Sequence, residues 1–205
     1  MNPYYWFCYH LIQLLGRIFF RLRYVHRDRM IDHGPVILAA NHQSFLDPPF
    51  AGGASKRAIY FLARRSLLDG PFLGWLLPKL NVIPVDSEGG KDRTALKALI
   101  RILRAGQGTL VFPEGQRTPD GNLQPAQPGL GLVIAKTLAP VVPMRIFGAY
   151  DAWPIHEKWP RLGQVTVVVG EPIYFTQEDV ETGGKEVYQG LSQRVMDAIA
   201  ALTME

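Results

Sequence analysis

Six short, largely apolar runs, separated by helical stretches, most constrain the fold of this chain. They are residues Val36–Ala40, Ile59–Leu62, Val82–Val85, Leu110–Phe112, Val141–Phe147 and Val165–Val169. Strands that are apolar throughout, instead of alternating with polar residues, are typical of a sheet covered on both faces. We therefore expect an α/β domain in which helices flank a mostly buried sheet.

Two helices are expected from the spacing of the apolar residues. One runs from about Lys91 to Arg104, and Gly106 is its expected C-terminal stop. The other runs from about Glu178 to Leu202, although Gly183 and Gly184 weaken the helical pattern at its start. Both helices have one apolar face, so each is expected to pack on the sheet.

Residues Tyr4–Phe20 form a mostly apolar and aromatic stretch that is too short for a confident membrane span. His10 and Gln13 interrupt it and Arg17 ends it, whereas a crossing helix needs roughly 20 apolar residues. The pattern also lacks the features of a secretory signal, which has positive charge before its apolar region. We expect an amphipathic helix that lies in the membrane interface; a helix packed on the protein's own core is the alternative.

The positive charge is concentrated at the N-terminus. Residues 1–31 contain five arginines and one acidic residue, so the formal charge of +4 lies there and the remaining residues are balanced at 17 basic and 17 acidic. A basic cluster beside an apolar helix favours anionic lipid headgroups over nucleic acid. We therefore expect residues 1–30 to anchor a domain of residues 31–205 to a membrane.

The cysteine content restricts the compartment. Cys8 is the single cysteine, which excludes a disulfide within the chain and leaves no Cys/His metal site to propose. A reducing compartment fits this composition, and we expect a peripheral or monotopic protein on the cytoplasmic face of a membrane.

Polar side chains follow three of the expected strands, where functional residues of α/β folds gather. Asn41 and His42 follow the first strand, Asp86 and Ser87 follow the third, and residues 113–117 follow the fourth. These segments are therefore candidates for one common site.

His42 and Asp47 are the candidate general base and its partner. A carboxylate that binds one imidazole nitrogen leaves the other free to take a proton from a hydroxyl. On a regular helix the two residues would lie about 140° apart, so a turn is needed, and Pro48 and Pro49 favour one. Ser44 is expected to cap this turn. The alternative is a purely structural histidine.

A second motif spans Phe112–Thr118. Gly115 permits a tight turn, which we expect to point Glu114 and Arg117 into one site. A guanidinium in such a loop suits bidentate recognition of a phosphate. The alternative is a surface loop with a solvated arginine.

Together these motifs resemble the signature of the glycerolipid acyltransferases, the family that includes 1-acylglycerol-3-phosphate acyltransferase. Its first block, His-x-x-x-x-Asp preceded by Asn, is matched at residues 41–47, and its Phe-Pro-Glu-Gly-x-Arg-Ser/Thr block is matched at residues 112–118. Its second and fourth blocks resemble residues 81–87 and 141–144. The resemblance covers about residues 34–172.

The resemblance implies a mixed sheet and a transfer of fatty acyl groups from acyl-CoA or acyl-carrier protein. The acceptor would be the free hydroxyl of 1-acylglycerol-3-phosphate and the product phosphatidic acid, in phospholipid biosynthesis. Membrane lipids, the acyl donor and the lysophospholipid would be the partners, with no nucleic acid, cofactor or metal. His42 and Asp47 would be catalytic. The residues expected to bind the acceptor are Asn41, Ser44, Glu114, Gly115, Arg117 and Thr118.

Three positions depart from the family pattern. Asn81 and Ser87 stand where the second block usually has Gly and Arg, and Gln127 stands where Lys is frequent. The last two changes remove positive charge, which leaves the acceptor open: another lysophospholipid or a lyso-aminolipid is the alternative. Arg117 and Arg93 are the candidate replacements for the missing cations.

The same residues are also compatible with two other functions. The rivals are a catalytically silent lipid-binding protein and, less favoured, a metal hydrolase that uses His42, Asp47 and Glu114. The apolar segment Phe72–Leu77 is expected to line an acyl channel, touch lipid or pack in the core.

Overall fold

The computed structural model describes residues 1–85 and 93–204. These residues form a seven-stranded sheet in the order β1-β7-β6-β2-β5-β3-β4. Neighbouring strands are parallel except for the antiparallel pair β6 and β7. The expected α/β fold with a mixed sheet is therefore confirmed. The strands are β1 (Arg23–Val25), β2 (Val36–Ala40), β3 (Ile59–Arg64), β4 (Val82–Val85), β5 (Gly108–Val111), β6 (Val141–Phe147) and β7 (Thr166–Val169).

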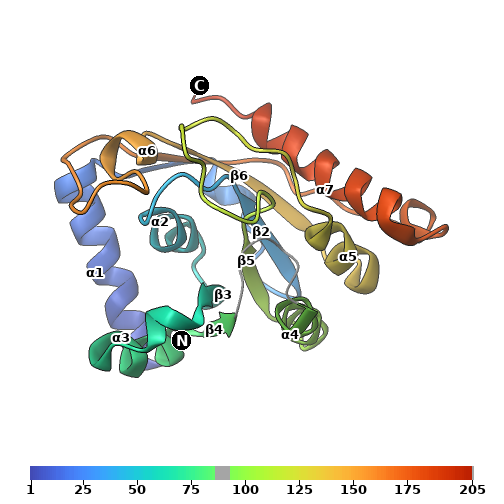
Figure 1. The fold of residues 1–205 in the computed structure, drawn as a ribbon, viewed down its shortest axis with the longest axis horizontal. Helices are drawn as coiled ribbons and strands as arrows, with labels where there is room; N and C mark the ends of the chain where they lie inside the picture. Colours follow the sequence, from blue (N-terminus) through green and yellow to red (C-terminus); the bar gives the residue numbers. More distant parts are fainter. Residues whose placement is uncertain (86–92, 205) are drawn as a thin grey trace.

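Helices cover both faces of the sheet (Figure 1). On one face α1 and α2 lie over a core that β2, β6 and β7 share, and on the other face α4, α5 and α7 enclose a second core. The helices are α1 (Pro3–Phe20), α2 (Asp47–Ala54), α3 (Pro71–Leu76), α4 (Arg93–Arg104), α5 (Pro128–Thr137), α6 (Ala149–Ala152) and α7 (Gly184–Ala200). Short 3₁₀ turns are η1 (Arg27–Arg29), η2 (Arg65–Leu68), η3 (Leu77–Leu80) and η4 (Glu178–Val180).

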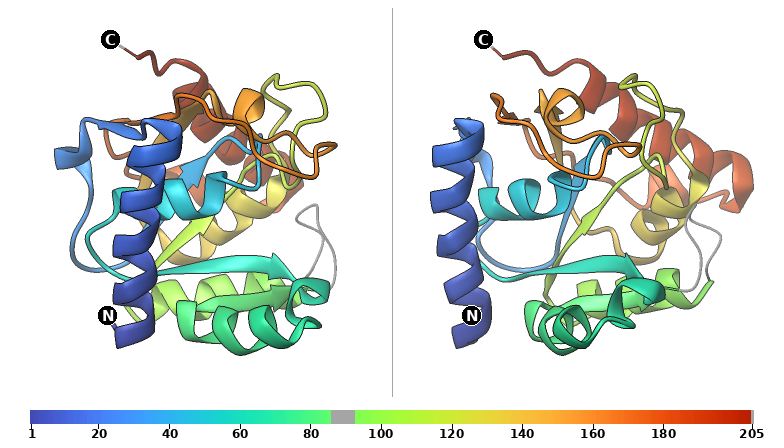
Figure 2. Two further views of the ribbon diagram at one scale, coloured as in Figure 1. Left: turned by 90° about the vertical axis from the view of Figure 1, so that its left-hand side faces the viewer. Right: turned by 60° about the vertical axis from the view of Figure 1, so that its left-hand side comes forward.

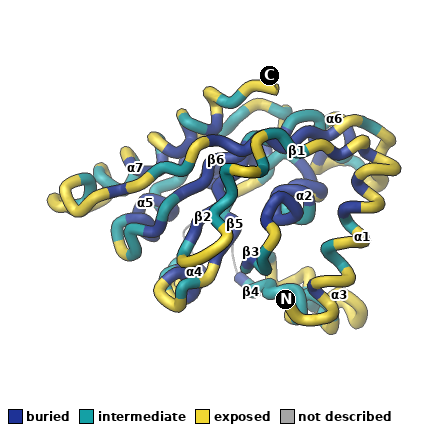
Figure 3. Tube along the Cα trace, turned by 180° about the vertical axis from the view of Figure 1, so that it is seen from behind, coloured by how far each residue is buried: buried dark blue, intermediate teal, exposed yellow. Residues whose placement is uncertain are grey.

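Strand β2 explains why the apolar runs are continuous. Val36, Leu38 and Ala40 point into one core, and Ile37 and Ala39 point into the other. All five residues are buried, as Figure 3 shows for the centre of the sheet. Successive side chains of a strand point to opposite faces, so a strand between two helical layers needs apolar residues at every position.

The helix α4 ends as the sequence predicts. Gly106 has φ +73°, and its N–H donates to the carbonyl of Leu103 at 2.9 Å. The N–H of Gln107 donates to the carbonyl of Ile102 at 3.1 Å. These two bonds satisfy carbonyls that the last turn of a helix leaves free, and glycine accepts the left-handed conformation that they need. The predicted start at Lys91 lies outside the described residues.

The helix α7 is shorter at its start than the sequence suggests. Gly183 and Gly184 have φ of +57° and +93°, a conformation that cannot continue a right-handed helix. Residues Glu178–Val180 therefore form a separate 3₁₀ turn, and α7 begins at Gly184. The apolar face predicted for this helix is otherwise found, since Leu191, Val195 and Ile199 are buried.

The helix α1 packs on the domain along one side only. Tyr5, Gln13, Gly16 and Phe20 are buried, and Gln13 Nε2 donates to the carbonyl of Gly53 in α2 at 2.8 Å. The opposite side exposes a stripe of large apolar residues. None of the described helices is both long and apolar enough to span a bilayer. The exposed residues are Tyr4, Trp6, Phe7, Leu11, Leu14, Leu15, Ile18 and Phe19.

The expected boundary at residue 30 does not coincide with a structural boundary. Strand β1 (Arg23–Val25) pairs with β7 at the edge of the main sheet. Arg27 Nε donates to the carbonyl of Ala54 at 2.7 Å, and Arg29 lies 2.8 Å from the Glu171 carboxylate. Residues 21–30 are thus part of the domain, because their backbone and two of the five N-terminal arginines bond within the fold.

Candidate active site

The buried strand β2 delivers Asn41 and His42 to the carboxyl edge of the sheet. Asn41 is 1% exposed, and its side-chain amide pairs with the backbone of Ile146 in β6. The Ile146 N–H donates to Asn41 Oδ1 at 2.7 Å, and Asn41 Nδ2 donates to the Ile146 carbonyl at 3.1 Å. Both hydrogen-bonding groups of this amide therefore tie the start of the loop to the neighbouring strand, and Asn41 does not line the cavity described below.

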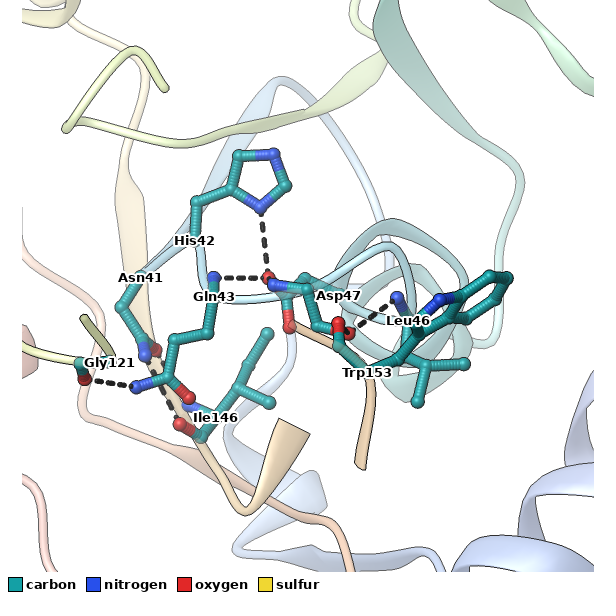
Figure 4. A network of polar contacts seen from close by, with 9 residues as sticks. Asn41, His42, Gln43, Leu46, Asp47, Gly121, Ile146 and Trp153 are labelled. Atoms are coloured by element: carbon teal, nitrogen blue, oxygen red, sulfur yellow. Dashed lines mark hydrogen bonds and ion pairs between the residues drawn. The ribbon is translucent and has the colours of Figure 1, made fainter. Parts of the chain in front are cut away.

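A turn brings His42 and Asp47 together, as the sequence predicts (Figure 4). Asp47 is fully buried at the start of α2, and its Oδ2 lies 2.9 Å from His42 Nδ1. The same oxygen accepts the backbone N–H groups of Gln43 at 2.5 Å and Ser44 at 2.6 Å. A carboxylate held by two N–H donors is an acceptor for a third, so it favours the imidazole tautomer with the proton on Nδ1. Nε2 then remains as the basic nitrogen.

Ser44 stabilises this turn and offers no nucleophile. Its side chain is fully buried, its Oγ donates to the carbonyl of Trp153 at 2.7 Å, and it accepts the N–H of Leu46 at 3.2 Å. The hydroxyl thus connects the turn to the segment that follows α6, and the expected capping role agrees with its contacts.

The second motif meets the first through its backbone and one aromatic ring. The N–H of Thr118 donates to the carbonyl of His42 at 2.8 Å. The ring of Phe112 stacks on the His42 imidazole, with centroids 3.9 Å apart and an interplanar angle of 11°. Gly115 has φ +76° and closes the turn with a 3.0 Å bond from its N–H to the Phe112 carbonyl. Thr118 is itself fully buried and lies outside the cavity wall.

Glu114 lies behind the His42 and Asp47 pair and does not point into the cavity, contrary to the sequence-based expectation. It is 2% exposed, and burial raises the pKa of its carboxyl to about 8. The negative charge of Asp47 raises this pKa further. The nearby backbone amides of His42 and Gln124 lower it, although neither makes a well-formed hydrogen bond to the carboxyl. Glu114 thus lies inside the fold, whereas Gln116, two residues further on, is exposed.

A cavity of about 380 Å³ opens at His42. Arg64, Arg117 and Gln127 give it polar groups, and the Arg117 guanidinium lies 3.8 Å from the centroid of the Phe45 ring. A polar end beside an apolar wall suits an amphipathic ligand. The apolar wall includes Leu62, Leu67, Val85, Leu96, Leu99 and Leu110.

Sequence reasoning missed Arg64 and Ser66 as lining residues. The signal that identifies them is topological, because Arg64 ends β3 and therefore lies at the same sheet edge as His42. In contrast, Asn81, Arg93 and the segment Phe72–Leu77 do not line this cavity. Ser87, the other position that departs from the family pattern, lies outside the described residues. Within the described part of the chain no three potential ligands gather into a metal site.

The chain is similar in sequence to known acyltransferases. A family model described as acyltransferase matches residues 21–147, more than half of the chain. The chloroplastic 1-acyl-sn-glycerol-3-phosphate acyltransferase of Brassica napus is 30% identical over 148 residues, which cover 71% of this chain and 43% of that protein. The 1-acyl-sn-glycerol-3-phosphate acyltransferase of Pseudomonas aeruginosa is 30% identical over 186 residues, which cover 88% of this chain and 68% of that protein.

One solved structure is similar over the whole chain. The 1-acyl-sn-glycerophosphate acyltransferase from Thermotoga maritima has a TM-score of 0.74 at 24% identity, and the match covers 100% of this chain and 81% of that one. This likeness shows a shared fold. The chain spans less than half the length of the Brassica relative, so the activity of the whole protein is a separate question.

Proposed function

The chain belongs to the acyltransferase family, and from this premise we propose that it transfers a fatty acyl group to the free hydroxyl of 1-acylglycerol-3-phosphate. The acyl donor is acyl-CoA or acyl-carrier protein, and the product is phosphatidic acid for phospholipid biosynthesis. One observation carries the proposal: His42 Nδ1 lies 2.9 Å from the buried Asp47 carboxylate, at the mouth of a cavity with a cationic and an apolar wall.

In the proposed reaction His42 is the general base. Nε2 takes the proton of the acceptor hydroxyl while the hydroxyl oxygen attacks the carbonyl carbon of the thioester. The Asp47 carboxylate stabilises the imidazolium that forms. The tetrahedral intermediate collapses when the carbon–sulfur bond breaks. The imidazolium then returns its proton to the departing thiolate. This scheme needs no nucleophile from the enzyme, in agreement with the buried, hydrogen-bonded hydroxyl of Ser44.

Arg64 and Arg117 are the proposed partners of the acceptor phosphate. Both line the cavity near His42, and a guanidinium can donate two parallel hydrogen bonds to a phosphate. Gln127 in the same wall is uncharged where the family frequently has lysine. This observation favours a second candidate acceptor, a lysophospholipid with a headgroup or a lyso-aminolipid.

The outward stripe of α1 supports association with a membrane surface. Eight large apolar side chains between Tyr4 and Phe19 are at least 38% exposed. Arg17 in the last turn of α1 and Arg21 and Arg23 just after it are exposed, whereas Arg27 and Arg29 are partly buried. Such a helix is suited to the boundary between headgroups and acyl chains. We place the protein on the cytoplasmic face of a membrane, peripheral or monotopic.

An acyl-transfer assay with a panel of lyso-acceptors tests this function. The wild type and His42→Ala are each given a long-chain acyl-CoA or acyl-carrier protein with 1-acylglycerol-3-phosphate, a zwitterionic lysophospholipid or a lyso-aminolipid. We expect the phosphate monoester to react fastest and His42→Ala to lose roughly 10²- to 10⁴-fold in rate. Preference for another acceptor would transfer the proposal to the second class. Binding of lysolipid without turnover would support a silent lipid-binding protein.

Arg117→Ala then tests recognition of the phosphate. We expect kcat/KM for 1-acylglycerol-3-phosphate to fall by roughly ten- to a hundredfold, because a charged hydrogen bond contributes about 1.5 to 3 kcal/mol. The value for a zwitterionic acceptor should change less. Equal losses for both acceptors would mean that Arg117 maintains the shape of the site and does not select the phosphate.

A further inference from the structure

The segment of residues 153–163, which follows α6, exposes apolar side chains to an unusual degree. Trp159 is 80% exposed and Leu162 is 78% exposed, the highest values among the large apolar residues that the structure describes. Lys158 and Arg161 alternate with them along the chain. Arg161 forms a 2.6 Å ion pair with Glu157, so the Lys158 ammonium is the net positive charge of this segment.

This segment continues the apolar stripe of α1. The N–H of Gly163 lies 3.4 Å from the carbonyl of Phe19, and the N–H of Val165 donates to the carbonyl of Phe20 at 2.8 Å. Leu162 therefore adjoins the C-terminal end of α1, where Ile18 and Phe19 are exposed.

The other end of α1 adjoins a second exposed apolar element. Tyr4 contacts Trp75 of α3 with ring centroids 5.4 Å apart, and Phe72 of α3 is 66% exposed. Figure 1 shows α1, α3 and the orange segment on the left side of the molecule, and this side faces the viewer in the left view of Figure 2. Three separate elements thus present apolar residues to the same side, whereas a single exposed residue would need no explanation.

The base of the segment contacts the candidate active site. The Trp153 carbonyl accepts the hydroxyl of Ser44, and the Trp153 ring lies 5.1 Å from the Phe45 ring. Phe45 in turn lines the cavity beside Arg117. A partner that binds residues 153–163 would therefore also restrain Phe45, which forms part of the cavity wall.

We propose that residues 153–163 form a second membrane contact, in which Trp159 and Leu162 enter the boundary between headgroups and acyl chains of an anionic bilayer. Tryptophan is favoured at this depth, and Lys158 and Arg161 lie where they meet lipid phosphates. The inference rests on the proposed contact of α1 with the membrane. Together the two contacts orient the molecule, so that the cavity opens at the lipid surface and receives a lysolipid directly.

Site-specific labelling tests this contact. In a Cys8→Ser background, Ile18→Cys, Leu162→Cys and Tyr174→Cys are each labelled with an environment-sensitive fluorophore and mixed with vesicles that contain phosphatidylglycerol. Tyr174 is 67% exposed beside Ile173, which pairs with the start of β6, at the edge of the sheet opposite the site. We expect the fluorescence emission of the labels at positions 18 and 162 to shift to shorter wavelength and to be quenched by spin-labelled lipid. The emission of the label at position 174 should not change.

The outcomes separate the two levels of the proposal. If the label at 18 enters the membrane and the label at 162 stays in water, the second contact is wrong and the role of α1 stands. If neither label enters, the membrane association itself fails. A blue shift at 162 that appears without vesicles and grows with protein concentration would instead identify a second copy of the chain as the partner, which overturns the proposal.

Vesicle affinity gives a second measure. We expect Trp159→Ser together with Leu162→Ser to weaken binding to phosphatidylglycerol vesicles by roughly tenfold or more, because two large apolar side chains leave the interface. Tyr174→Ser is the matched control and should bind like the wild type, and thermal unfolding of all three proteins should coincide. Unchanged affinity of the double variant would contradict the inference.

Discussion

Asp47 has two separable roles at the residue scale. Its Oδ2 orients His42, and it also accepts the backbone N–H groups of Gln43 and Ser44 in the turn before α2. A carboxylate at a helix N-terminus is favoured by the helix dipole as well. The residue is therefore important both for the proposed chemistry and for the local fold.

Substitution of Asp47 is expected to separate these roles. Asp47→Ala should lose at least roughly 10²-fold in kcat/KM and about 1 to 3 kcal/mol in free energy of unfolding, because two backbone N–H donors, one of them buried, lose their acceptor. Asp47→Asn keeps an acceptor oxygen, so it should lose most of the rate with a smaller loss of stability. Steady-state kinetics and urea unfolding of both variants measure this. A wild-type rate in Asp47→Asn would remove Asp47 from the mechanism.

Glu114 gives a prediction about pH. Burial raises its pKa from 4.5 to about 8, so between these values the folded protein keeps a proton that the unfolded chain releases. Stability should therefore fall as the pH rises through this window. Glu114→Gln cannot titrate, and we expect it to reduce this fall between about pH 5 and 8 by an amount on the order of a few kcal/mol.

Urea unfolding at several pH values measures this difference. Glu186→Gln, a change at an exposed glutamate of α7, is the control and should leave the pH dependence as in the wild type. Parallel pH curves for wild type and Glu114→Gln would show that the Glu114 carboxyl is ionised throughout the range.

At the scale of elements, α5 packs closely against α7 at a glycine. A Cβ on Gly131 of α5 would lie 1.9 Å from the backbone oxygen of Tyr188 in α7. The N–H of Gly131 also donates to the buried Ser192 hydroxyl at 2.8 Å. The small residue lets the two helices approach, and this packing supports the cavity wall because the first turn of α5 lines it.

Paired glycine substitutions test this contact. Gly131→Ala should lower the free energy of unfolding by about 1 to 3 kcal/mol, since the helices must move apart. Gly190→Ala lies in α7 with no atom within 4 Å of the added Cβ, so it should raise the free energy by roughly 0.5 to 1 kcal/mol through helix propensity. Thermal or urea unfolding gives both values. Destabilisation of equal size in the two variants would contradict the packing argument.

At the scale of the whole molecule, we expect the exposed apolar stripe of α1 and the exposed arginines Arg17, Arg21 and Arg23 to bind a membrane together. Deletion of residues 1–30 is not a clean test, because it removes β1 from the sheet. Arg17→Gln with Arg23→Gln leaves the fold intact, since both arginines are exposed. We expect this pair to weaken binding to anionic vesicles, and the effect should shrink as salt rises, because roughly 0.5 M salt screens exposed charges beyond a few ångström.

Sedimentation with vesicles across a salt series measures this effect. Lys136→Gln with Lys185→Gln removes the same charge at exposed positions on α5 and α7, and it should bind like the wild type. Equal weakening by both pairs would show that net charge, and not the position of the arginines beside α1, controls the association.

The sequence alone determined the class of fold and the pairing of His42 with Asp47. Continuous apolar strands predicted a sheet covered on both faces, Gly106 predicted the end of α4, and the prolines after Asp47 predicted the turn that brings it to His42. Each of these predictions depends on residues close in the chain, whose periodicity and backbone preferences act locally.

The tertiary structure decided which of these groups face the cavity. Glu114 lies inside the fold, Asn41 pairs with Ile146, and Arg64 reaches the cavity from β3, although nothing in the local sequence distinguishes their directions. Residues 153–163 likewise join the stripe of α1 only through backbone contacts at its end. These outcomes depend on which strands are neighbours in the sheet, and pairing between residues distant in the chain is a property of the packed whole that no local pattern contains.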